Sequence, residues 1–208
     1  MAGKTHRKND QKTKRSQEPG RRAEISAKAH KIFMRHGYHK TTIEDIGKAC
    51  GLGKAALYYY FPSKEAIFVE VVRTESAEIL RQITKAIEAV EDPRKKLSEM
   101  IKTRFKLVSD IMEDIIGRDL GEELLELLPM AAMARQEFFS EEANLIRQIL
   151  TEGQRQGVFK EIPSPELPLL IISAIRGIEL HFAEIQQAPS QDDAIDLMTK
   201  LFFEGICQ

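Results

Sequence analysis

Apolar positions recur with a helical period along most of the chain. In the first such segment, after residue 20, these positions are Ile25, Ala29, Ile32 and Phe33. Their spacing of three and four residues places them on one face of a helix, and Gly37 lies where a C-terminal cap is expected. No stretch of the sequence alternates β-branched and polar residues for long enough to predict a strand. The pattern therefore predicts an all-α fold.

Two short helices joined by a glycine turn are predicted between residues 42 and 61. Thr42, with Asp45 three positions later, resembles a capping box at the start of the first helix. The letters GLG at 51–53 end that helix, and Lys54 to Phe61 forms the second, which stops before a proline. A short helix, a turn and a second short helix are typical of the helix-turn-helix unit.

The rest of the chain also has the pattern of helices. Ser63 caps a helix that we expect to run to about Glu91, where a following proline ends it. Later breaks are expected near residues 117–121, Pro129, Gly157, 163–168 and 187–193. The chain then divides into a basic tail at 1–20, which we expect to be disordered, a helix-turn-helix domain at 21–66 and a larger helical domain at 67–208.

Charge is distributed far less evenly than the net value of −1 suggests. Residues 1–64 carry 15 Lys and Arg against 5 Asp and Glu, whereas residues 65–208 carry 16 against 27. This asymmetry predicts that the first segment faces a polyanion. The six basic residues from Lys4 to Arg15 predict either an arm that adds to DNA affinity or a solubilising extension.

The segment GLGKAALYYYF at 51–61 allows two interpretations. Its first six letters fit G-x-G-x-x-A, the glycine turn of a dinucleotide site. That turn follows a β-strand, whereas here the preceding segment is a capped helix and the following sequence predicts no strand. We therefore interpret the glycines as the turn between two helices.

The consecutive aromatic residues of this segment cannot all enter one core. Because an α-helix turns by about 100° per residue, Leu57 and Phe61 share one face, while Tyr58 and Tyr59 project away from it. We expect at least one of these two tyrosines to be exposed, and Tyr60 to lie near the edge of the core. A phenol hydroxyl beside a lysine-rich surface is suited to a phosphate contact.

The stretch TTIEDIGKACGLGKAALYYYFPSKEAIF, at 41–68, resembles the DNA-binding signature of the TetR family of bacterial transcriptional regulators. The agreement is close over about residues 21–70, and the remainder agrees in helical character and length. The resemblance implies about nine helices, with a ligand-binding and dimerisation domain after the helix-turn-helix. It also implies a repressor that forms a homodimer through its last two helices. The homodimer binds a palindromic operator and leaves it when a small effector binds.

The resemblance assigns DNA contacts to nine residues. These are Thr42, Gly53, Lys54, Ala55, Ala56, Tyr58, Tyr59, Tyr60 and Lys64. By family analogy, residues at the start of the second short helix reach base edges, and the hydroxyl groups and Lys64 contact phosphates. Gly53 replaces the usual capping Ser or Thr, and Ala55 and Ala56 replace Gly-Thr, so few polar groups remain to read bases. This predicts base reading by Lys54, alanine contacts to thymine methyl groups and a contribution from DNA shape.

The larger domain offers apolar and cationic candidates for an effector site. They are Phe105, Met112, Met133, Phe138, Arg104, Arg118, Arg176 and His181. Met and Phe provide an adaptable apolar surface, and Arg and His could meet an anionic head group, although each residue could equally be ordinary core or reach solvent. We expect a hydrophobic or amphipathic effector. The segment 165–185 is apolar around its circumference, which favours a helix–helix interface.

Other classes of function find less support in the sequence. An architectural DNA-binding protein without an effector is the main alternative, and an enzyme on a helical scaffold is a third possibility. The histidines and cysteines match no common metal-ligand frame, and no Walker, nucleophile-elbow or zinc-protease motif occurs, so we expect no catalytic site, metal or cofactor. The apolar runs are too short to span a membrane, and the two cysteines cannot form a disulfide framework. Both observations predict a cytoplasmic protein.

Overall fold

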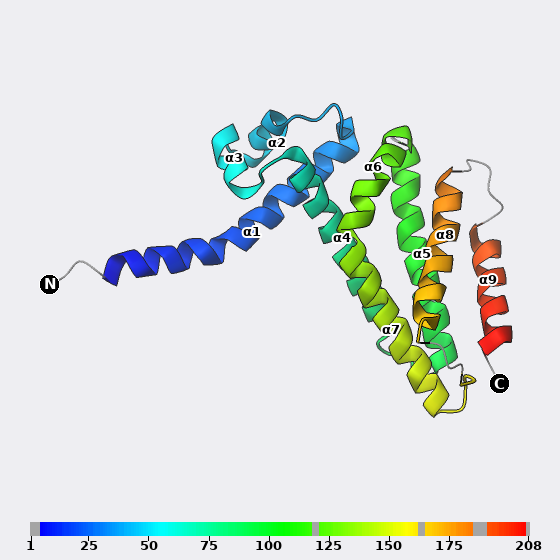
Figure 1. Cartoon of the computed structure of the whole chain (residues 1–208). Helices are drawn as coiled ribbons and strands as arrows, with labels where there is room; N and C mark the ends of the chain where they lie inside the picture. The colour runs from blue at the N-terminus through cyan, green and yellow to red at the C-terminus, as the bar shows by residue number, and fades with distance from the viewer. Residues whose placement is uncertain (1–4, 118–120, 162–164, 185–190, 207–208) are drawn as a thin grey trace. The chain divides into compact units, whose positions relative to one another are not determined.

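A computed structural model describes residues 5–117, 121–161, 165–184 and 191–206, and it shows helices joined by short connections (Figure 1). The nine helices of these residues are α1 Thr5–His36, α2 Ile43–Cys50, α3 Lys54–Tyr60, α4 Lys64–Ile87, α5 Pro93–Gly117, α6 Gly121–Ala134, α7 Gln136–Arg155, α8 Leu167–Glu184 and α9 Gln191–Ile206. The all-α prediction is confirmed. None of the described helices is both long and apolar enough to cross a membrane.

The first helix begins earlier than the sequence pattern predicts. A disordered tail was expected over 1–20, but α1 begins at Thr5 and includes most of that segment. Lys, Arg, Gln and Glu make up half of residues 5–20, and all four are favourable helix formers, so a segment without apolar residues can still extend a helix. Residues 1–4 lie outside the described part.

Two other helix boundaries also differ from the prediction. α4 ends at Ile87 instead of near Glu91, and the chain then turns, with the backbone N–H groups of Glu88 and Val90 donating to the carbonyl oxygens of Lys85 and Ile87. Asp92 caps the next helix by accepting a hydrogen bond from the backbone N–H of Lys95 (2.8 Å). Pro129 lies inside α6 and does not break it. A proline within a helix removes one backbone hydrogen bond, which tertiary packing can offset. The break at Gly157 is confirmed by its left-handed backbone (φ +71°).

The chain forms two compact units, and the first contains the predicted helix-turn-helix. This first unit consists of residues 1–75 and 122–134, so it includes α1 to α3, the first half of α4 and nearly all of α6. Its core contains Ile25, Ala29, Phe33, Tyr38, Ile43, Ile46, Cys50, Leu57, Phe61, Ile67, Val71 and Leu127. Leu127 comes from α6, so a helix that the sequence placed with the larger domain packs in the core of the first unit.

The second unit consists of residues 76–121 and 135–208. Within it α5 contacts α7, α8 and α9, and α7 also contacts α8. Its core contains Ile79, Ile83, Ile87, Leu97, Met100, Ile101, Phe105, Phe138, Ala143, Ile146, Ile149, Leu150, Phe159, Ile171, Ile172 and Ile175. The apolar faces of α4, α5, α7 and α8 therefore pack together in one common core.

Candidate nucleic-acid interface

The start of α2 is fixed by the capping box that the sequence predicts. The Thr42 hydroxyl accepts a hydrogen bond from the backbone N–H of Asp45 (3.2 Å), and the Asp45 carboxylate accepts one from the backbone N–H of Thr42 (3.0 Å). The Thr42 hydroxyl also donates to this carboxylate (2.6 Å), and these contacts lower the pKa of Asp45. Thr42 is thereby held, exposed, at the N-terminus of α2, where an anion is favoured.

A glycine turn separates α2 from α3. Gly51 caps α2 in the left-handed conformation (φ +64°), and its backbone N–H returns to the carbonyls of Gly47 and Lys48. Gly53 begins α3 with extended backbone and no side-chain cap. The dinucleotide interpretation remains rejected, because the segment before this turn is a helix.

The aromatic residues of α3 divide between core and surface, as predicted. Leu57 and Phe61 are fully buried, whereas Tyr58 is 43 % exposed and Tyr59 is 71 % exposed. Tyr60 is half-buried at the edge of the core, and its ring meets that of Tyr59 edge to face (5.1 Å between centroids). Two adjacent phenol groups therefore lie on the surface of a helix whose opposite face is anchored in the core.

Two arginines of α1 hold the C-terminal ends of both short helices, a role that the sequence reasoning missed. Arg21 donates to the carbonyl oxygen of Cys50 at the end of α2 (3.0 Å), and Arg22 donates to that of Tyr60 at the end of α3 (2.5 Å). Arg22 also lies over the Phe61 ring, with its guanidinium carbon 4.1 Å from the centroid. Cations favour helix C-termini, so this pair fixes α2 and α3 against α1.

Lys54, the predicted base-reading residue, is paired with an acid of α2. Its ammonium lies 2.5 Å from a carboxylate oxygen of Glu44, and both side chains are about half exposed. The pairing raises the pKa of Lys54 and lowers that of Glu44, so both groups stay charged. Gly53, Ala55 and Ala56 are exposed beside them. Glu44 was not predicted, although its position two residues after Thr42 places it on the exposed start of α2.

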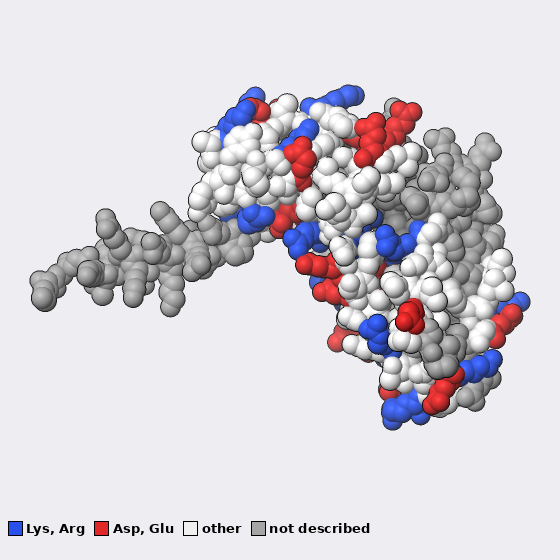
Figure 2. All heavy atoms as spheres, in the orientation of Figure 1, with Lys and Arg blue, Asp and Glu red and all other residues white. Residues whose placement is uncertain are grey.

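Lys64 contacts backbone carbonyl groups of its own unit. Its ammonium donates to the carbonyl oxygens of Tyr38 (2.9 Å) and Thr41 (3.0 Å), and it lies 4.2 Å from the centre of the Tyr38 ring. Its predicted phosphate contact remains a prediction. On the face drawn in Figure 2, the first unit shows both basic and acidic side chains around a largely uncharged surface.

Comparison with known proteins places this geometry in a family. Residues 25–71 match the family model described as bacterial regulatory proteins, tetR family. The HTH-type transcriptional regulator YxaF of Bacillus subtilis is 28 % identical over 160 residues, which cover 75 % of this chain and 81 % of YxaF. The fatty acid metabolism regulator protein of the same species is 24 % identical over 135 residues, 64 % of this chain and 68 % of that protein. The fatty acid degradation regulator FadR of Bacillus halodurans has a similar fold (TM-score 0.66, 20 % identity, 88 % of this chain and 94 % of FadR).

The matched segment spans α2 and α3 and the parts of α1 and α4 that pack against them. Through this DNA-binding domain the chain belongs to the TetR family. It is therefore a transcriptional regulator of helix-turn-helix type, and its relatives are regulators as well. In this TetR-family chain α2 is the helix that precedes the turn and α3 the one that follows it.

The predicted effector residues of this TetR-family chain are divided between the two units. Phe105 and Phe138 are buried in the core of the second unit, and Met112 is half-buried on α5. Met133 is 79 % exposed and belongs to α6 in the first unit. Arg118 and the His181 side chain lie outside the described part.

The two remaining arginines of that prediction are held by other side chains. Arg104 and Glu142 form a buried ion pair between α5 and α7, with Arg104 Nε 2.6 Å from Glu142 Oε1 and side chains only 3 % and 0 % exposed. Arg176 stacks on the Phe139 ring, with its guanidinium carbon 3.3 Å from the ring centre. Among the described residues, no group of His, Cys, Asp and Glu could hold a metal ion.

A surface groove of about 850 Å³ lies elsewhere in the second unit, between α4, the start of α5 and α7. Leu80, Ile87, Pro93, Leu145 and Ile149 contribute its apolar lining. Its charged lining residues are Arg81, Lys85, Lys96, Glu88, Glu91 and Glu152. A site of this size suits a small molecule with an apolar part and a polar head, but none of the effector candidates whose side chains are described lines it.

Proposed function

We propose that this chain is a ligand-responsive repressor that binds a palindromic DNA operator as a homodimer. The observation that carries the DNA contact is the surface formed by the exposed N-terminus of α2 at Thr42 and by the hydroxyl groups of Tyr58 and Tyr59, on a rigidly anchored pair of helices. Hydroxyl groups and helix N-termini are common phosphate ligands. Lys54 stands at the start of α3, the position that reaches base edges in helix-turn-helix proteins.

Exposed leucines on the last two helices support the homodimer. Leu169 and Leu170 on α8 and Leu197 and Leu201 on α9 are each more than half exposed. Leu197 and Leu201 are four residues apart and so lie on one face of α9. Apolar surface of this kind is typical of a protein–protein interface, and a second copy of the chain would place two recognition helices on two half-sites.

The DNA contacts are tested by three substitutions. The probe is a duplex that the unaltered full-length protein selects from a random library. Lys54→Ala is expected to relax base preference at one position by ~1–3 kcal/mol, and Tyr59→Phe to weaken binding to all sequences by ~1 kcal/mol. Glu44→Ala should instead tighten binding, because it removes a negative charge beside Lys54.

Binding curves with the selected duplex and with random duplexes, at several salt concentrations, measure these effects. Footprinting on DNA separates the two candidate functions. A short palindromic footprint supports an operator-binding regulator. Extended and uniform coverage would instead indicate an architectural protein. If Tyr59→Phe leaves both affinities unchanged, the phosphate contact of that side chain is wrong.

The effector is proposed to bind in the groove of the second unit, with its apolar part on Leu145 and Ile149 and an anionic head near Lys85 or Lys96. A fatty acid or its thioester has this chemistry, and two of the compared regulators are named for fatty acid metabolism or degradation. A ligand releases DNA only if it binds the two conformations of the protein unequally. A cytoplasmic location is consistent with both partners.

Filling the groove tests this assignment. Gln148→Trp adds a large side chain to the groove wall at an exposed position, and Asn144→Trp adds the same side chain one turn earlier on α7, outside the groove lining. Dodecanoate should displace the selected duplex from the unaltered protein and from Asn144→Trp. Gln148→Trp should need about tenfold more, equivalent to ~1.4 kcal/mol. An unchanged response of Gln148→Trp would place the effector outside this groove.

A further inference from the structure

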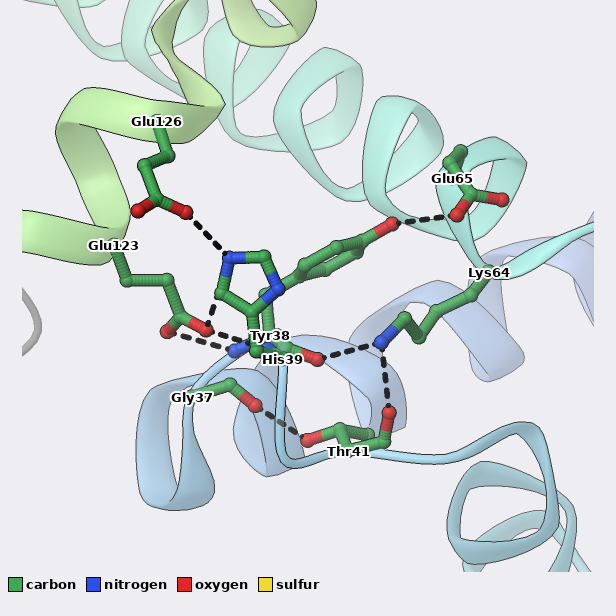
Figure 3. Close-up of polar contacts among 8 residues, drawn as sticks. All are labelled: Gly37, Tyr38, His39, Thr41, Lys64, Glu65, Glu123 and Glu126. Carbon is green, nitrogen blue, oxygen red and sulfur yellow. Dashed lines mark hydrogen bonds and ion pairs between the residues drawn. The ribbon is translucent and has the colours of Figure 1, made fainter.

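The loop between α1 and α2, residues 37–41, is held from α6 by one carboxylate. Glu123 accepts hydrogen bonds from two successive backbone N–H groups, that of Tyr38 at Oε2 (2.9 Å) and that of His39 at Oε1 (2.5 Å) (Figure 3). Each carboxylate oxygen thus has its own donor. Hydrogen bonds to an ionised acceptor are about twice as strong as those between neutral groups.

The carbonyl groups of the same loop face a cation. Lys64 donates to the carbonyl oxygens of Tyr38 and Thr41, and the Tyr38 hydroxyl donates to Glu65 (3.0 Å) (Figure 3). Burial and this contact raise the pKa of Tyr38, so its hydroxyl remains a donor. An anion on the N–H side and a cation on the carbonyl side therefore fix the loop between α4 and α6.

The loop has little freedom to adopt another path. Gly37 has a left-handed backbone (φ +82°), and a Cβ atom at this position would lie 2.6 Å from Glu123 Oε2. The buried Thr41 hydroxyl closes the loop by donating to the carbonyl oxygen of Gly37 (2.6 Å). Thr42, the N-cap of α2, follows immediately. The position of Thr42 therefore depends on the groups that hold residues 37–41.

A second contact from α6 is more exposed. The His39 ring nitrogen Nε2 lies 2.9 Å from Glu126 and 4.0 Å from Glu123, and the side chains of His39 and Glu126 are more than half exposed. Contacts between exposed charged groups add little stability, so Glu123 carries most of the restraint. Glu123 itself is largely covered, with 17 % of its side chain exposed.

We propose that Glu123 is a positioning residue for DNA binding. Its carboxylate fixes residues 37–41 and thereby holds Thr42 and the N-terminus of α2 where they meet a DNA phosphate. This role rests on the proposed phosphate contact at Thr42. Glu123 lies 85 residues from Tyr38 in the sequence, on a helix whose chain neighbours α5 and α7 both belong to the second unit.

The test compares full-length variants on the duplex selected by the unaltered protein. Glu123→Ala is expected to weaken binding by about tenfold or more, which corresponds to ~1.4 kcal/mol. The affinity of Glu123→Gln should lie between those of Glu123→Ala and the unaltered protein, because glutamine keeps one acceptor oxygen. Glu122→Ala is the matched control: it removes the same charge from an exposed side chain one position earlier on α6, and it should bind as the unaltered protein does.

Hydrogen exchange separates positioning from general stability. In Glu123→Ala the amides of Tyr38 and His39 should exchange faster, whereas that of Leu57, bonded to the carbonyl of Gly53, should keep its protection. If Glu123 only stabilised the fold, protection would fall throughout the first unit. Gly37→Ala should mimic the loss of Glu123, while Gly157→Ala, with similar backbone strain but open space around its Cβ, should not.

The outcomes distinguish this role from the proposed function. If the unaltered protein enriches no duplex, operator binding itself is wrong. If it does so and both Glu123 variants bind as tightly as Glu122→Ala, only the role of Glu123 is wrong. Should Glu123→Ala fail to fold, Glu123→Gln decides, since it preserves the size of the side chain.

Discussion

Replacing Leu57 by Ala is expected to destabilise the first unit by ~2–5 kcal/mol, the usual cost of truncating a buried leucine. α3 has only seven residues, and a helix this short is not stable by itself in water. Leu57 and Phe61 are the fully buried side chains that attach it to the core. DNA binding should therefore be lost together with the fold of α3. Urea unfolding and binding to the selected duplex measure the two effects.

Tyr58→Ala is the matched control for this substitution. Tyr58 follows Leu57 directly but is 43 % exposed, so its truncation should change the free energy of unfolding by only about 0.5 kcal/mol. DNA affinity should nevertheless fall, because a proposed phosphate contact is removed. If Tyr58→Ala destabilised the unit as much as Leu57→Ala, the division of α3 into a core face and a contact face would be wrong.

Replacing Arg104 by Met is expected to lower the free energy of unfolding of the second unit by ~3–5 kcal/mol, the usual cost of removing one partner from a buried ion pair. The Arg104 and Glu142 side chains are almost completely buried, so the Glu142 carboxylate cannot regain water when the guanidinium is lost. Chemical unfolding followed by circular dichroism measures the loss.

The double variant Arg104→Met with Glu142→Leu provides the control. Removing both charges leaves an apolar contact between α5 and α7, and much of the lost stability should return. If Arg104 instead contacted an effector, the single substitution would change the effector response at unchanged stability. Equal instability of the single and double variants would show that charge pairing is not the cause.

The helix-turn-helix was predictable because its determinants are local. Thr42 and Asp45 form the predicted capping box, and Gly37 and Gly51 adopt the left-handed conformation suited to their caps. The period of 3.6 residues separated Leu57 from the exposed Tyr58 and Tyr59 correctly. Each of these features depends on residues within one or two helical turns of one another.

The effector candidates stay a prediction, because residue type alone does not distinguish a core from a cavity. Phe105 and Phe138 have the composition expected of a pocket but fill the core of the second unit. Arg104 had the charge to meet an anionic ligand, but Glu142, 38 positions away, already neutralises it. The groove is lined by residues such as Lys85 and Gln148 that no sequence pattern singled out.

The sequence by itself determined the helical fold and the surface of α3, since periodicity and caps act over a few residues. Only the tertiary structure decided the position of α6. Leu127 places that helix in the core of the first unit, and Glu123 then reaches two backbone N–H groups 84 and 85 residues away. The partners of this carboxylate are backbone N–H groups, and no particular side chain in the sequence indicates them. The contact therefore becomes visible only when the helices are packed.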